Sequence, residues 1–113
     1  MDMDESKFKI VIDALVAKAK SILPPGSRLT LYGSQARGEA TPDSDWDLHL
    51  LIEGPEKISF DQMMQYVIPF GDTGMQLGEV VNTAVYTFKG WMRRSFLPYF
   101  QNVTKEGIII YEN

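Results

Sequence analysis

Two short stretches, separated by a few polar residues, most constrain what this chain of 113 residues can fold into. Residues 33–38 (GSQARG) are small or polar and open with glycine, which favours a sharp turn. Residues 44–48 (SDWDL) follow a turn-forming Thr-Pro-Asp, and their charged and apolar side chains alternate as in a half-buried strand. The pattern therefore places a small-residue turn within a few residues of two carboxylates.

Asp45 and Asp47 are predicted to point to one face of a strand, because side chains alternate across a sheet. Their α-carbons would then lie about 7 Å apart, while Trp46, Leu48 and Leu50 face the core. Carboxylates this close repel each other, so each holds its proton more tightly unless a cation lies between them. Magnesium suits this arrangement, because it binds one or two carboxylates together with phosphate oxygens and water.

The glycine turn supplies the complementary half of this predicted site. Gly33 lets the backbone approach a ligand closely, and Ser34 is predicted to cap a brief helical turn whose free N–H groups favour an anion. Arg37 could hold a phosphate with its guanidinium, or it could equally pair with a neighbouring aspartate or with Glu39. A triphosphate tail could rest on this turn, so the two halves together suit a magnesium–nucleotide site.

Each half alone also has a purely structural interpretation. A Gly-Ser turn before a helix is a common cap, and Asp-x-Asp after a proline turn is often solvated loop. The two halves in this order favour the functional interpretation. The turn is not the Walker phosphate loop, because no Gly-Lys-Ser/Thr closes it.

Apolar spacing along the rest of the chain predicts a mixed α/β fold, with a small mixed sheet covered by helices on one face. Helices are expected over residues 8–22, 34–37, 60–68 and 89–103, and strands over residues 28–32, 45–52, 77–88 and 108–111. Pro69 and Gly71 are expected to end the third helix, and Pro98 to break the last one. The whole chain, residues 1–113, is expected to form one domain.

Composition limits the partners that this chain could have. The formal net charge of -4 argues against a wide basic surface for nucleic acid. The chain has no cysteine and one histidine, which excludes thiolate zinc sites and leaves a hard, oxygen-binding ion as the expected metal. The acidic N-terminus and the lack of an apolar run of about 20 residues predict no membrane segment and a cytoplasmic location.

Residues 33–38 and 44–48 together resemble the Gly-Ser-x-Ala-Arg-Gly…Ser-Asp-x-Asp-Leu signature of the minimal nucleotidyltransferases, within the DNA polymerase beta-like nucleotidyltransferase superfamily. The resemblance implies the nucleotidyltransferase fold and its reaction. In that reaction a nucleoside monophosphate is transferred to an acceptor, often a hydroxyl, and pyrophosphate is released. The substrate implied is a nucleoside triphosphate, ATP in the first place, and the implied cofactor is Mg²⁺ as two ions.

The same resemblance implies roles for single residues. Phosphate or nucleotide would be bound by Gly33, Ser34, Arg37 and Ser44, and the metal-binding and catalytic residues would be Asp45, Asp47 and Glu79. The superfamily usually has a third carboxylate on a neighbouring strand, and Glu79, at the start of the predicted 77–88 strand, is the best-placed acid here. The family residue is often an aspartate deeper in the strand, where this chain has VVNT at 80–83. If Glu79 is only an exposed residue at a strand end, the pocket binds nucleotide but transfers it slowly or not at all.

Two alternative functions stay open at this point. Many minimal nucleotidyltransferases resemble antitoxin subunits that pair with a small helical partner, which implies a catalytically weak nucleotide-binding module. In that setting the acceptor would be a tyrosine hydroxyl of the partner, modified with AMP. The other alternative is an interaction protein whose acidic face binds a cation and nothing more. His49, on the same predicted face as the two aspartates, could line the pocket or serve only as a hydrogen-bonding strand residue.

Overall fold

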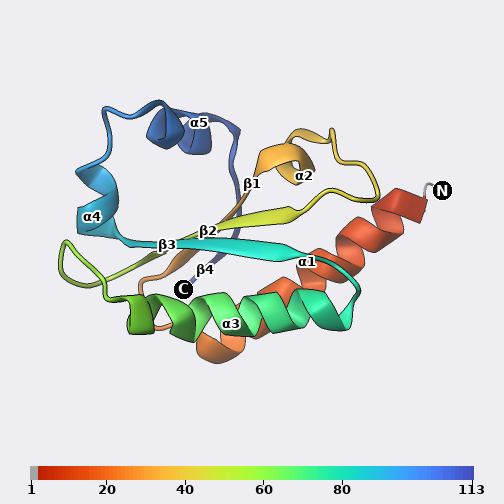
Figure 1. Cartoon of the computed structure of the whole chain (residues 1–113), viewed down its shortest axis with the longest axis horizontal. Helices are drawn as coiled ribbons and strands as arrows, with labels where there is room; N and C mark the ends of the chain where they lie inside the picture. The colour runs from red at the N-terminus through yellow and green to blue at the C-terminus, as the bar shows by residue number, and fades with distance from the viewer. Residues whose placement is uncertain (1–2) are drawn as a thin grey trace.

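The computed structural model describes residues 3–113, in which four strands form one central sheet and five helices pack around it (Figure 1). The elements are α1 (Met3–Ile22), β1 (Arg28–Tyr32), α2 (Gly33–Arg37), β2 (Trp46–Ile52), α3 (Phe60–Gln76), β3 (Val81–Thr87), α4 (Phe88–Met92), α5 (Pro98–Glu106) and β4 (Ile108–Glu112). Within this described range, no helix has the length and apolar character needed to cross a lipid bilayer.

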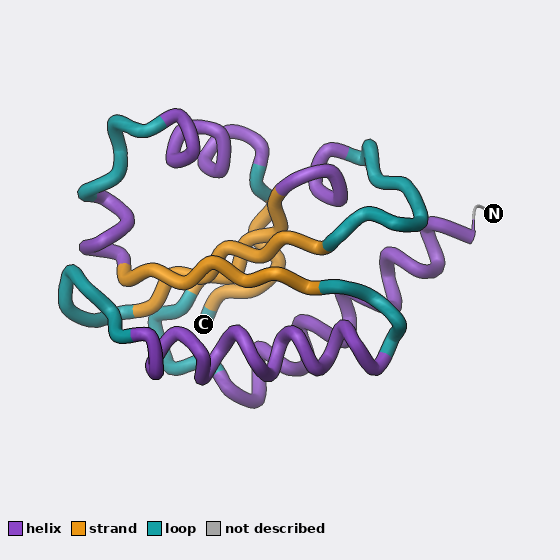
Figure 2. The backbone as a smooth tube through the Cα atoms, in the orientation of Figure 1, coloured by secondary structure: helices purple, strands orange, loops and turns teal. Residues whose placement is uncertain are grey.

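The four strands form one mixed sheet in the order β3-β2-β1-β4, drawn in orange in Figure 2. β1 pairs antiparallel with both β2 and β4, while β2 and β3 run parallel. Asp47 of β2 consequently has a neighbour on each side, with Tyr32 opposite it on β1 and Asn82 opposite it on β3. The end of β1 that leads into the glycine turn thus lies beside the acid-bearing end of β2.

Alternate residues of β2 explain which face of the sheet carries the acids. Trp46, Leu48 and Leu50 are almost fully buried and form the main core with α1 and α3. In Figure 1 these two long helices lie together on one side of the sheet. Burial of side chains this large contributes about 1.5–3 kcal/mol each, so the core side of β2 is strongly determined and the acids face the other way. The predicted mixed α/β fold is confirmed.

The opposite face of the sheet carries a smaller aromatic cluster, built with the short helices α4 and α5. Leu51 of β2 is buried there with Trp91 and Val103, and Tyr86 and Tyr99 pack against them. In Figure 1, α4 and α5 lie across the sheet from α1 and α3, so helices cover both faces of the sheet and not one face as predicted. The face that carries the acids is therefore buried where the aromatic cluster covers it, forming a second core. At Asp45 the same face is open to solvent.

Helix α3 is longer than the sequence predicted. Pro69 and Gly71 were expected to end it, but the helix continues to Gln76. Its second half is buried against β3, where Gly74 lies so close to Val81 that a Cβ atom would overlap the valine side chain. This packing outweighs the backbone hydrogen bond that Pro69 removes.

Several other boundaries also differ from the prediction, and two of them have a clear physical cause. The helical segment predicted over residues 89–103 is broken into α4 and α5, as expected, but the break precedes Pro98, which begins α5 as suits a residue with a fixed φ and no N–H group. Strand β3 begins at Val81 and not at Leu77, because Gly78 adopts a φ of 71° in a turn between α3 and β3. Glu79 therefore lies in this turn and outside the strand. The last predicted strand is present and pairs with β1 as β4.

Candidate active site

Asp45 and Asp47 lie side by side where the chain enters β2. Both accept a hydrogen bond from the same amide, because Asn82 Nδ2 lies 3.1 Å from Asp45 Oδ2 and 3.4 Å from Asp47 Oδ1. Asn82 reaches both carboxylates from its position opposite Asp47 in the parallel pair of β2 and β3. Sequence reasoning missed Asn82, because its contact with Asp47 joins residues 35 positions apart through the pairing of two parallel strands.

The glycine turn lies against one of these carboxylates. Gly33 is buried, with a φ of 75°, at the junction of β1 and α2. A Cβ atom on this residue would lie 2.6 Å from Asp47 Oδ2, which is too close for carbon and oxygen. The turn therefore needs glycine both for its backbone conformation and for the room that Asp47 occupies. The cap of α2 is Tyr32, without a side-chain hydrogen bond, so the prediction that Ser34 caps this helix is wrong.

A cavity of about 330 Å³ opens beside Asp47 on the acid-bearing face, with Tyr32, Asn82 and Tyr99 among its lining residues. The rings of Tyr32 and Tyr99 meet edge to face, with centroids 5.8 Å apart. Burial, and then the neighbouring groups Tyr86, Tyr32 and Asp47, raise the pKa of Tyr99 to about 12, so its hydroxyl stays protonated at neutral pH. The cavity is within the size range of small-ligand pockets and places two phenol groups next to Asp47.

The atoms gathered here suit a hard cation. Asp45 and Asp47 supply carboxylate oxygens, the ligands that magnesium prefers, and the group that joins them is a neutral amide. Over residues 3–113, no ion pair joins either aspartate to a lysine or arginine. The negative charge of the pair is therefore left without a protein counter-charge, and a divalent ion would compensate it.

Comparison with known proteins identifies the family of this chain. The sequence model of a family described as "Nucleotidyltransferase domain" matches residues 12–108, which is most of the chain. The chain belongs to the nucleotidyltransferase domain family. The resemblance carried by the glycine turn and the acid pair is thereby confirmed.

Three known proteins illustrate the similarity of this nucleotidyltransferase domain to others in sequence or in fold. A protein of Methanocaldococcus jannaschii named "Putative protein adenylyltransferase MJ0604" is 27% identical over 108 residues, covering 96% of this chain and 98% of that protein. A crystal structure of "a putative nucleotidyltransferase from Sulfolobus solfataricus" has a TM-score of 0.67 at 17% identity, covering 100% of this chain and 90% of that one. A crystal structure of "the toxin-antitoxin with AMP-PNP" has a TM-score of 0.63 at 15% identity, covering 90% of this chain and 73% of that one. The two structural likenesses show a shared fold.

Two residues of the nucleotidyltransferase signature that were expected to bind phosphate have partners within the protein. Arg37 Nε donates to Glu39 Oε1 at 2.6 Å, and Arg37 Nη1 lies 3.5 Å from Glu106 Oε2. The hydrogen bond to Glu39, with help from Glu106, raises the pKa of Arg37. Ser44 Oγ accepts a hydrogen bond from the Thr41 N–H at 2.8 Å and closes the turn before β2. Of the two alternatives for Arg37, the structure contains the pairing with Glu39.

Glu79 lies apart from the two aspartates, contrary to the role expected for it. Its carboxylate accepts a hydrogen bond from Trp46 Nε1 at 2.9 Å and pairs with Lys7 Nζ at 3.1 Å. Trp46 points into the core, away from the acids, and the Glu79 carboxylate that it binds lies on that same side of the sheet. In the part of the chain that the structure describes, no three His, Asp or Glu side chains are placed to hold a metal together. The third carboxylate expected at Glu79 is therefore missing from the site, and Asn82 lies beside Asp47 instead.

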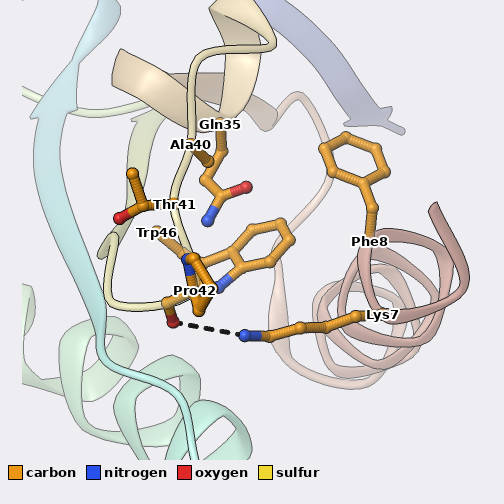
Figure 3. A pocket seen from close by; sticks show the side chains of 7 residues that line it. All are labelled: Lys7, Phe8, Gln35, Ala40, Thr41, Pro42 and Trp46. Atoms are coloured by element: carbon orange, nitrogen blue, oxygen red, sulfur yellow. Dashed lines mark hydrogen bonds between the residues drawn. The ribbon is translucent and has the colours of Figure 1, made fainter. Parts of the chain in front are cut away.

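Lys7 also holds the loop that leads into β2. Figure 3 shows Lys7 Nζ reaching the carbonyl oxygen of Pro42, a distance of 3.4 Å, below the ring of Trp46. The rings of Trp46 and Phe8 lie 5.5 Å apart between centroids. The hollow among these residues measures about 40 Å³, which is room for water and not for a nucleotide. These contacts fix the entry to β2, and with it Asp45, from the core side.

His49 shares the face of the two aspartates, as predicted, but lies inside the aromatic cluster. It is 2% exposed, and its ring centroid lies 4.1 Å from that of Trp91 and 5.5 Å from that of Tyr86. Burial lowers the pKa of His49 to about 4, so the ring is neutral at neutral pH. Among the described residues His49 Nε2 has no hydrogen-bond partner. His49 therefore packs within the aromatic cluster and is not among the residues that line the cavity beside Asp47.

Proposed function

We propose that this protein transfers AMP from ATP to an acceptor hydroxyl, with release of pyrophosphate. Membership of the nucleotidyltransferase domain family supports a transferase. The similar protein named as a protein adenylyltransferase supports ATP as the donor and a protein as the acceptor. The observation that carries the proposal is the contact between turn and acids, in which Asp47 lies against Gly33 while Asn82 joins it to Asp45.

The protein contributes to this reaction by positioning the reactants and by supplying charged and polar groups that bind the metal and the phosphates. Asp45 and Asp47 would hold the magnesium, which in the family is present as two ions. When bound, magnesium would neutralise charge on the transferred and leaving groups and activate the acceptor oxygen. The N–H groups at Gly33 and Ser34 would bind the β- and γ-phosphates. Holding nucleotide and acceptor together makes the step effectively unimolecular.

Arg37 and Ser44 have lesser parts in the proposal. Arg37 would reach a phosphate by giving up its ion pairs with Glu39 and Glu106. Because its side chain is exposed, losing those pairs costs little free energy. Ser44 would act through the turn that it closes ahead of the acids. We assign Glu79 no part in holding metal, because Trp46 and Lys7 bind its carboxylate.

The acceptor in this proposal is a hydroxyl of a small helical partner protein. The likeness to the toxin-antitoxin structure with AMP-PNP supports a fold that serves in such pairs. The net charge of -4 argues against nucleic acid as the acceptor. An exposed Asp45 leaves the acid pair open to a partner from the solvent side.

A catalytically weak nucleotide-binding module is the second candidate, and one observation favours it. Asn82 supplies an amide at the strand position facing Asp47, where a carboxylate would strengthen the metal site. Such a protein would bind ATP and magnesium and act on its partner through binding alone.

The test follows the label from ATP to the partner. The protein is incubated with magnesium, ATP labelled at the α-phosphate and a candidate small helical partner protein. The proposal predicts a labelled partner, with labelling lost in Asp47→Asn and kept in Asp72→Asn, an exposed aspartate of α3 across the sheet. ATP binding without labelling would favour the second candidate, and absence of ATP binding would overturn both.

A further inference from the structure

Asn82 holds the position in the sheet from which a side chain reaches both aspartates. The register of the parallel strands sets Asn82 opposite Asp47, and neighbouring strands lie about 4.8 Å apart. Its amide donates to Asp45 and to Asp47 at once. Whatever side chain occupies this position therefore determines what lies between the two carboxylates.

Charge determines how many cations such a site can hold. The two carboxylates together balance a single divalent ion. A second divalent ion a few ångströms away would be repelled by the first unless another negative group lies between them. Asn82 is neutral, so it does not offset that repulsion. Its N–H group also occupies lone pairs of both carboxylates that a second ion would need.

No other described acid can take the place of Asn82. Glu79 is the acid nearest in sequence, and Trp46 and Lys7 hold its carboxylate on the core side. Across residues 3–113, no group of three or more His, Asp or Glu side chains is placed around one point. A second cation would consequently depend on the phosphates of the nucleotide.

We propose that Asn82 is a positioning residue that limits the protein's own cation site to a single divalent ion, held by Asp45 and Asp47. This inference rests on the proposed function, because it concerns the same two aspartates. It assigns the limit of a single ion to one amide. Replacing that amide by a carboxylate of the same shape is then expected to create the ligand for a second ion.

The experiment counts bound Mn²⁺ by electron paramagnetic resonance on the full chain without nucleotide. Binding to the wild type is expected to saturate at a single ion per chain and to be lost in Asp47→Asn. Asn82→Asp is expected to bind a second ion and to bind the first on the order of tenfold more tightly, because the new charge lies beside it. Gln65→Glu adds the same charge on an exposed position of α3 across the sheet and is expected to change neither value.

A wild type that binds a pair of Mn²⁺ ions would overturn the inference, and so would a folded Asn82→Asp that behaves like Gln65→Glu. Either result leaves the proposed transfer intact, because transfer is read from labelled ATP. If the wild type binds neither Mn²⁺ nor ATP, the proposed function fails together with the inference. The count on the wild type tests the inference even if Asn82→Asp does not fold.

Discussion

At the scale of single residues, two glycines separate the effect of backbone conformation from that of contact with the acid. Gly33 and Gly38 adopt nearly the same φ, 75° and 72°. A Cβ atom on Gly33 would meet Asp47 Oδ2 at 2.6 Å, while one on Gly38 would have no atom within 4 Å. The pair therefore offers a matched test of the contact that carries the proposed function.

Gly33→Ala and Gly38→Ala are both expected to lower the free energy of unfolding by about 1 kcal/mol or more, because alanine resists a positive φ. Only Gly33→Ala also displaces the Asp47 carboxylate, so only this variant is expected to lose affinity for magnesium-ATP, by about tenfold or more, a difference of about 1.4 kcal/mol. Urea unfolding and isothermal titration calorimetry measure the two quantities. Equal ATP affinities for the two variants would contradict the role of the contact.

The buried His49 makes stability depend on pH. The pKa of His49 is about 4 in the folded protein, against an ordinary value of 6.5, because burial disfavours the charged ring. On acidification the unfolded chain binds the proton first, so this stabilisation is complete above pH 6.5 and is lost as the pH falls toward 4. The expected loss is about 2 kcal/mol by about pH 5. Urea unfolding at neutral and mildly acidic pH, compared with His49→Phe, checks this, and an identical pH dependence in the variant would refute it.

At the scale of elements, the contact between α3 and β3 sets where Asn82 lies. Gly74 packs directly on Val81, and the Glu79 N–H donates to the Gly74 carbonyl oxygen at 2.9 Å. The turn between helix and strand is therefore anchored to the helix end, and Asn82 is the next residue after Val81. Helix α3 thus holds the register of β3 against β2.

Gly74→Ala is expected to lower the free energy of unfolding by roughly 1–3 kcal/mol, because its Cβ atom has no room beside Val81. Gly71→Ala, one turn earlier, meets no atom within 4 Å and is expected to raise the free energy of unfolding by roughly 0.5–1 kcal/mol. Thermal unfolding of both variants gives the comparison. If Gly74→Ala is as stable as Gly71→Ala, helix and strand are not in close contact there.

At the scale of the whole molecule, the sequence predicts what local pattern encodes and misses what strand pairing decides. Alternation along residues 44–48 is local, so the common face of Asp45 and Asp47 could be predicted from five residues, although β2 itself begins at Trp46. The position of Glu79 could not be predicted in this way, because it depends on where the turn after α3 ends and β3 begins. Asn82 could not either, because its contact with Asp47 spans 35 residues of sequence and arises from the register of two parallel strands. Long-range pairing of this kind leaves no periodic trace.

The central claim, that the acid pair and the glycine turn form one magnesium-nucleotide site, is tested most directly by ATP affinity measured with and without magnesium. The wild type is expected to bind ATP at least about tenfold more tightly with magnesium. Asp45→Asn/Asp47→Asn is expected to lose that difference, because neutral amides do not hold the ion that joins protein and phosphates. Binding that is independent of magnesium, or a double variant that keeps the full magnesium dependence, would contradict the account.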